Sequence, residues 1–193
     1  MSRVCQTVHE STLTTDRGPT DIVPTPTTTI MSPRATTEFL LESPAFKEGG
    51  KIPATYTCEG TDTSPELAIG GVPDDAASLA LVVDDPDAPG GTFVHWLLWN
   101  LPPSTIRLPR GVRQGPAVAA LDGARQGTNG FNTVGYRGPC PPRGDGPHNY
   151  RFTLYACDTE LDVPAGVKSP KLMAAIEASE IEHTRLTGTY ERV

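Results

Sequence analysis

The sequence predicts an all-β fold with minor α structure, in which two antiparallel sheets form a sandwich and a peripheral helix lies near the C-terminus. Two observations predict it. The 193 residues include 20 prolines and 19 glycines, which divide the chain into short segments. Several of these segments are apolar runs bounded by turn residues, and they do not alternate with helical patterns as they would in a βαβ fold.

Four segments have the composition and length of strands. They combine apolar, β-branched and aromatic residues, and turn signals follow them. They are SLALVVDD (78–85), HWLLWNLP (95–102), YRFTLYAC (150–157) and LTGTYER (186–192). In the second segment, strict alternation places His95, Leu97 and Trp99 on one face, and Trp96 and Leu98 on the other.

One segment, SPKLMAAIEASEIE (169–182), predicts a helix. Ser169 can cap its N-terminus, Pro170 suits the first helical position, and the apolar residues form one narrow face. We expect His183, which follows the segment, to be an exposed histidine at the helix end.

The first 37 residues differ from the rest of the chain. Residues 1–37 are rich in threonine and proline and contain few apolar residues, so they cannot form a core. We expect a disordered tail over residues 1–37, followed by one domain over residues 38–193.

The charge and the cysteines restrict the partners and the location. The net charge of −7 and the pI near 5.0 argue against nucleic acid as a partner. No apolar run of about 18 residues and no apolar core of a signal peptide is seen, so we expect no stable membrane insertion and a cytoplasmic chain with reduced thiols. Cys58 and Cys140 each lie beside a motif described below, and a contact between them is left open. Cys157 fits a buried apolar position.

The loop DDPDAPGGTFVHW (84–96) can serve as a turn and as the edge of a site. Asp85 and Asp87 flank Pro86, whose fixed backbone angle restricts the geometry of both carboxylates. His95 then begins the next strand. A turn needs the prolines and glycines, but it does not need two carboxylates and an imidazole.

A second loop, GYRGPCPPRGDGPHNYRF (135–152), repeats this pattern. Its prolines and glycines lead into a strand on which His148, Tyr150, Phe152 and Leu154 share one face. The polar members of this row lie at the rim of the predicted core, where a pocket can open.

If the two loops meet, their side chains suit a phosphorylated ligand. A carboxylate beside an imidazole raises the imidazole pKa, and imidazolium and tyrosine hydroxyl groups donate to phosphate oxygens. Asp85 and Asp87 would repel the anion itself but accept from an ammonium or hydroxyl group of a zwitterionic phosphate. As a weaker alternative, the same aspartates together with His95 and His148 can bind a divalent metal, as in a metal-dependent hydrolase. No nucleophile motif or phosphate-binding loop motif is present, and we expect no cofactor.

The two loops resemble one known family. The motifs DPDAP, HW, NLP, GYRGPCPPRGDGPHNYRFTLYA, IPATYTCEGTDTSPEL and LTGTYER are similar to those of the phosphatidylethanolamine-binding protein (PEBP) family. The resemblance is to its prokaryotic, Raf kinase inhibitor-like (YbhB/YbcL-type) branch, and it extends over residues 39–193. Two departures are Asn149, where arginine is usual, and Ile69, where tryptophan is usual.

The resemblance implies a PEBP-like β-sandwich with a small anion-binding pocket at one end and no catalytic reaction. It also implies phosphorylated head groups as ligands and, in some members, inhibition of kinases or serine proteases through surface loops. The expected function is therefore binding of a small anionic or zwitterionic phosphate, with protease or kinase inhibition as an alternative. The implied pocket residues are Asp85, Asp87, His95, Gly138, Pro141, His148 and Tyr150.

Overall fold

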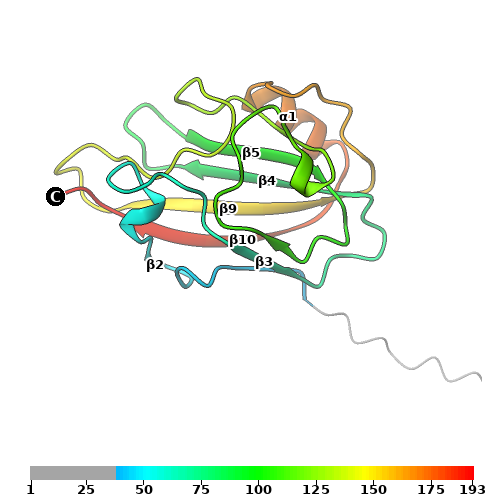
Figure 1. Ribbon diagram of the computed structural model, residues 1–193, viewed down its shortest axis with the longest axis horizontal. Helices are drawn as coiled ribbons and strands as arrows, with labels where there is room; N and C mark the ends of the chain where they lie inside the picture. The colour runs from blue at the N-terminus through cyan, green and yellow to red at the C-terminus, as the bar shows by residue number, and fades with distance from the viewer. Residues whose placement is uncertain (1–37) are drawn as a thin grey trace, which may run out of the picture. The chain divides into compact units, whose positions relative to one another are not determined.

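The computed structural model describes residues 38–193 as a β-rich domain with one α-helix (Figure 1). The predicted tail, residues 1–37, lies outside the described residues. The strands are β1 (Leu40–Glu42), β2 (Gly50–Lys51), β3 (Leu67–Gly70), β4 (Ser78–Asp85), β5 (Phe93–Leu101), β6 (Arg107–Leu108), β7 (Ala117–Val118), β8 (Ala124–Gln126), β9 (His148–Cys157) and β10 (Glu180–Tyr190). The helices are α1 (Ser169–Glu177) and two short 3₁₀ helices, η1 (Ala54–Tyr56) and η2 (Ala119–Leu121).

Two sheets confirm the predicted sandwich. A seven-stranded sheet has the order β2-β10-β9-β4-β5-β8-β7, and a three-stranded sheet has the order β1-β3-β6. Neighbouring strands are antiparallel, except that the short β2 pairs with β10 in parallel. The long strands β4, β5, β9 and β10 lie side by side in Figure 1.

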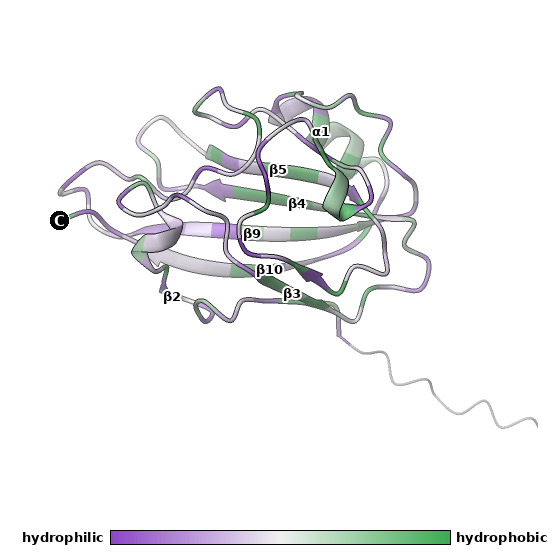
Figure 2. Cartoon of the chain, viewed as in Figure 1, coloured by the Kyte–Doolittle hydropathy of each residue, from purple (hydrophilic) through white to green (hydrophobic). Residues whose placement is uncertain are grey.

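The apolar residues form two clusters, one on each face of the large sheet. The main core includes Trp96 and Phe152 and also takes in residues of the small sheet. The second cluster joins Trp99 to Leu172 and Ile176 of α1. Figure 2 shows hydrophobic colours along β4 and α1. Because full burial of a large apolar side chain contributes roughly 1.5–3 kcal/mol, these clusters supply most of the driving force for folding.

The C-terminal helix is shorter than predicted. It ends at Glu177, and β10 begins at Glu180 instead of continuing the helix to residue 182. The reason is pairing with β9, since residues from Glu180 onward pair with that strand and outweigh local helix propensity. Lys168, not Ser169, occupies the N-cap position and makes no side-chain capping bond. Within residues 38–193, no helix is long and apolar enough to cross a membrane.

His183 therefore lies on a strand and not at a helix end. It is exposed, as expected, and its ring contacts Tyr155 at a centroid distance of 5.6 Å. Its Nδ1 lies 2.6 Å from Glu180 Oε1.

A β-bulge in β5 changes the orientation of His95. Val83 pairs with Trp96 and Asp84 pairs with Val94, so His95 is an extra residue without a partner in this register. Bulges redirect side chains near functional sites. The prediction that His95 shares a face with Leu97 and Trp99 was therefore wrong, because the alternation is interrupted at His95 itself.

Cys58 and Cys140 form a disulfide, with their Cα atoms 5.4 Å apart. The expectation of reduced thiols was wrong for this pair, because the fold brings together two loops that are 82 residues apart in the sequence. Cys157 is free and buried, as predicted.

Candidate ligand-binding site

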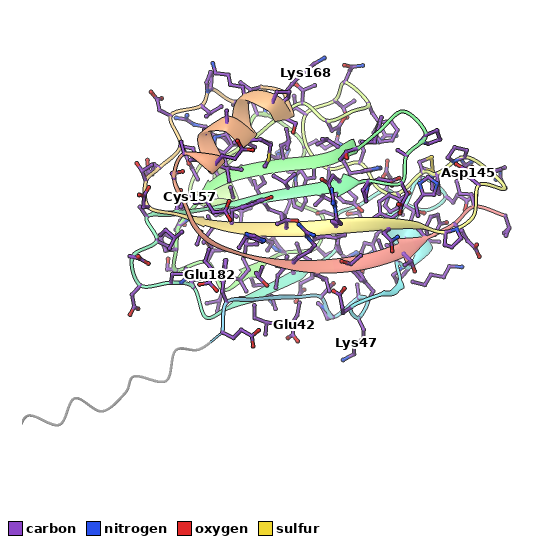
Figure 3. The ribbon with its side chains drawn as sticks, turned by 180° about the vertical axis from the view of Figure 1, so that it is seen from behind. Glu42, Lys47, Asp145, Cys157, Lys168 and Glu182 are labelled. Carbon is purple, nitrogen blue, oxygen red and sulfur yellow. A yellow bond between two sulfur atoms is a disulfide. The ribbon has the colours of Figure 1, made fainter. Side chains whose placement is uncertain are left out.

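The two Pro/Gly-rich loops meet at one end of the large sheet. β4 and β9 are antiparallel neighbours in which Asp84 pairs with Arg151, so the end of β4 lies beside the beginning of β9. In Figure 2, hydrophilic colours appear at both of these strand ends. Figure 3 shows Asp145, in the loop before β9, and Cys157, the last residue of β9, at opposite ends of the sheet.

A buried bond joins the loops. His148 Nδ1 lies 2.8 Å from Asp85 Oδ2, and both side chains are buried. Asp85 Oδ1 accepts a hydrogen bond of 2.9 Å from the backbone N–H of Asp87, which closes the turn around Pro86. The Asp85 carboxylate therefore holds its own loop and the first residue of β9.

His148 lies between two carboxylates. Its Nε2 is 3.3 Å from Oδ2 of Asp145, whose side chain is partly exposed. Burial by itself disfavours the charged ring, but the hydrogen bond and charge of Asp85, together with those of Asp145, outweigh burial and raise the pKa of His148. The ring is thus stabilised as imidazolium with both of its N–H groups engaged.

Asp87 interacts with β9. Its Oδ2 accepts hydrogen bonds from the backbone N–H of Asn149 at 2.8 Å and from the Asn149 side-chain amide at 2.9 Å. These bonds lower the pKa of Asp87. Asn149, at the position where the resemblance led us to expect arginine, therefore binds the second carboxylate of the loop.

His95 is buried near this pair. Its Nδ1 lies 2.8 Å from the carbonyl oxygen of Arg137, and its ring contacts those of Phe93, Phe131 and Tyr150 at centroid distances of 5.2–5.6 Å. Burial lowers the pKa of His95, although the Arg137 carbonyl and the Asp85 charge oppose this effect.

Tyr150 contributes a buried hydroxyl group. The ring belongs to the main core, and the hydroxyl lies next to the Asp85 carboxylate and the backbone of Cys140. Burial, the charge of Asp85 and a hydrogen bond with Asp85 raise the pKa of Tyr150, so the hydroxyl keeps its proton at neutral pH. The protonated hydroxyl can therefore donate to the Asp85 carboxylate.

Gly138 has a packing role. A Cβ atom at this position would lie 2.0 Å from the carbonyl oxygen of Tyr56, closer than any real contact. The backbone N–H of Gly138 donates to Asp62 Oδ1 at 2.7 Å. This amide is therefore already engaged and does not face a ligand.

A cavity of about 180 Å³ opens between the loops. Of the seven residues predicted for the site, four line the cavity, namely Asp85, His95, Pro141 and His148. Asp87, Gly138 and Tyr150 are not among the lining residues. Sequence reasoning did not identify the remaining wall residues, which are Ala88, Pro89, Phe93, Phe131, Cys140 and Pro142. Most of these residues belong to the two predicted loops, so their closeness in sequence to the predicted site residues was the signal that could have identified them. Phe131 lies between Thr128 and Val134, which form a bridge, just before the second predicted loop, and had no such signal.

A larger hollow of about 560 Å³ lies elsewhere, lined by residues of β1 and β10 and by the segment after β1. It contains neither of the two histidines of the loops. Its size alone does not make it the better candidate, because polar groups that converge on a pocket identify a site better than volume does.

A metal site was the alternative interpretation of the same side chains. Over residues 38–193, no group of three or more His, Cys, Asp and Glu side chains is arranged to hold a metal ion. Both ring nitrogens of His148 lie within hydrogen-bond distance of carboxylates, and Nδ1 of His95 lies within hydrogen-bond distance of a carbonyl oxygen. These three nitrogens are therefore engaged within the protein.

Comparison with known proteins identifies the family. The sequence profile described as phosphatidylethanolamine-binding protein matches residues 42–191. The chain belongs to this family.

Other members show how far the similarity extends. A Pyrococcus horikoshii relative, named UPF0098 protein PH1269, is 47% identical over 150 residues, which are 78% of this chain and 75% of the relative. A Mycobacterium tuberculosis protein named as a lipoprotein, LppC, is 40% identical over 151 residues, covering 78% and 71% of the two chains. The crystal structure of Escherichia coli YbcL, described as a member of the mammalian PEBP family, has a TM-score of 0.76 and 34% identity, covering 81% of this chain and all of YbcL. The similarity to YbcL supports the prokaryotic branch.

Proposed function

We propose that the protein binds a small phosphorylated ligand, such as free phosphate or the head group of a phospholipid, in the cavity between its two loops. It acts as a binding or regulatory protein and not as an enzyme. The observation that supports this most strongly is the Asp85–His148 pair, which brings polar groups from two distant loops to the wall of one cavity. Membership of the phosphatidylethanolamine-binding protein family also supports a binding or regulatory role.

The chemistry of the site fits a zwitterionic phosphate. His95 lines the cavity and can form a hydrogen bond with the phosphate group, and the Tyr150 ring packs against the His95 ring. Asp85 can accept from an ammonium or hydroxyl group of the same ligand. The rings of Phe93 and Phe131 and the prolines of the wall exclude water and strengthen these interactions.

The size of the cavity favours a head group. Pockets for drug-sized ligands usually measure about 300 Å³ or more. The cavity here, at about 180 Å³, is smaller, so lipid chains would have to remain outside it.

Titration with inorganic phosphate and with phosphoethanolamine, followed by NMR, tests the proposal. We expect saturable shifts of the His95 and His148 ring signals and of the Tyr150 amide. His183 is exposed and on a different part of the sheet, so its ring is an internal control that should not shift. Lack of change at all three site residues would exclude the proposal.

Two alternatives remain predictions that can be tested separately. Protease or kinase inhibition through surface loops predicts that a His148→Ala variant loses phosphate binding but keeps inhibition, and a panel without any inhibited enzyme would contradict it. A metal-dependent hydrolase would require bound metal, which elemental analysis of the purified protein detects.

The Cys58–Cys140 disulfide argues against the cytoplasmic location that the sequence predicts. Disulfides persist mainly in oxidising compartments, so this bond favours such a compartment for the protein. The name of the Mycobacterium tuberculosis relative, a lipoprotein, also favours a location outside the cytoplasm. Trapping of free thiols by alkylation in separated cell fractions, followed by a count of modified cysteines, decides between a reduced and an oxidised pair.

A further inference from the structure

The side chains that line the cavity offer acceptors and few free donors. Asp85 is an acceptor, and both nitrogens of His148 are engaged by Asp85 and Asp145. In the described part of the chain, no lysine or arginine is among the residues that line this cavity. An anion therefore meets no free cation at the wall.

The tautomer of His95 is fixed by its neighbour. A carbonyl oxygen can only accept, so His95 Nδ1, 2.8 Å from the Arg137 carbonyl, must carry a hydrogen. In the neutral ring, Nε2 then has a lone pair and no hydrogen. Nε2 can accept from a ligand, but it can donate only after the ring gains a proton.

The charges around His95 do not replace the missing donor. The titratable and charged groups that face the ring are Asp85 on β4, His148 and Tyr150 on β9, and Asp62 and Arg137 in adjoining loops. Arg137 and Asp62 form an ion pair at 2.7 Å, so their charges offset each other. The charge of His148 is likewise offset by Asp85 and Asp145. Burial lowers the pKa of His95 and keeps the ring neutral around neutral pH.

We propose that the cavity selects ligands that carry a hydrogen-bond donor, and that a fully deprotonated oxyanion binds only when His95 Nε2 takes up one proton. This inference rests on the proposed function, because it specifies how the same cavity accepts its phosphate. A phosphate monoester with one protonated oxygen donates that proton to Nε2 in a hydrogen bond. An oxyanion without a proton binds together with one proton from solvent, which stays on Nε2 and donates to the oxyanion.

Sulfate is the appropriate probe, because it carries no proton near neutral pH. Calorimetry of the full chain with sulfate, in two buffers of different ionisation enthalpy, gives the number of protons taken up for each sulfate bound. We expect about one proton above the pKa of His95, and an affinity that falls about tenfold for each pH unit in that range.

A His95→Asn variant is the matched test of the residue. The asparagine amide can still donate to the Arg137 carbonyl, but nothing replaces Nε2. We expect sulfate to bind at least about tenfold more weakly at low pH and without proton uptake, since one charge-assisted hydrogen bond contributes roughly 1.5–3 kcal/mol. Thermal unfolding of the variant checks that it is folded.

Three outcomes would overturn the inference. Sulfate binding by the unmodified protein without proton uptake contradicts it and leaves the proposed function intact. Full proton uptake in the His95→Asn variant would show that another group is protonated. Absence of both sulfate and phosphate binding from about pH 5.5 to about pH 8.5, the range in which histidine titrates, would overturn the proposed function as well.

Discussion

His148 Nδ1 lies 2.8 Å from Asp85 Oδ2, although the two residues are 63 positions apart in the sequence, and both side chains are buried. The bond connects the end of β4 to the beginning of β9 and supports the wall of the cavity between the loops. It is both a structural link and part of the candidate site, so changes at either residue should affect stability and ligand binding together.

Replacement of Asp85 by Asn should lower the free energy of unfolding by about 3–5 kcal/mol, the usual cost of leaving one member of a buried ion pair without its partner. Denaturant unfolding measures the loss, and NMR titration should show a decrease in the pKa of His148. Asp145→Asn is the control. Its side chain is 45% exposed, so a loss of no more than about 1 kcal/mol is expected. Equal losses in the two variants would contradict the central role of Asp85.

The stability contributed by His148 should depend on pH. Because its pKa is raised in the folded protein, the stabilisation is fully present below the unfolded value of about 6.5 and is lost as pH rises through the folded pKa. His148→Asn keeps a donor near the Nδ1 position but does not titrate. The difference in unfolding free energy between the native protein and this variant should therefore decrease with rising pH, and a difference that stays constant from about pH 6 to about pH 9 would refute the prediction.

Gly138→Ala should destabilise the protein by about 3 kcal/mol or more, because overpacking against backbone atoms cannot relax by a side-chain rotation. The new methyl group would lie 2.0 Å from the Tyr56 carbonyl oxygen. Gly90→Ala is the matched control, since nothing lies within 4 Å of a Cβ atom at that position. Thermal or denaturant unfolding compares the stabilities of the two variants. Similar unfolding midpoints would contradict the prediction, because they would show that the loop can move away from Tyr56.

Loss of the Cys58–Cys140 disulfide should reduce stability by roughly 4.5 kcal/mol, the loop-entropy value for a cross-link between positions 82 apart. A variant with serine at both positions tests this by denaturant unfolding. Reducing agent should destabilise the native protein to a similar extent and should leave the double variant unchanged. A native protein whose midpoint does not respond to reduction would contradict the prediction. Because Cys140 lines the cavity, phosphate affinity should be measured in parallel.

The strands of the core could be predicted because their pattern is local. The segment 78–85 coincides with β4, and Tyr150, Phe152 and Leu154 face one core as expected from alternation. The end of α1 could not be predicted in this way, since pairing of Glu180 with β9 decides it. Local propensity alone extends the helix into that strand.

The residues of the candidate site could be predicted only in part, and their role in binding stays a prediction. The composition of the loops identified Asp85, His95 and His148, but the sequence could not show that they meet, and that expectation depended on the family resemblance. Three features depend on tertiary contacts and had no local signal. They are the bulge that reorients His95, the engagement of Asp87 by Asn149, and the disulfide.

The most direct measurement is a crystal structure of the protein soaked with phosphoethanolamine, with a parallel soak in a divalent metal. We predict that the phosphate lies in the cavity between the two loops, with an oxygen within hydrogen-bond distance of His95 Nε2, and that the cavity binds no metal. An unoccupied cavity at saturating ligand, or a phosphate bound only elsewhere on the surface, would contradict the assignment of this cavity as the binding site.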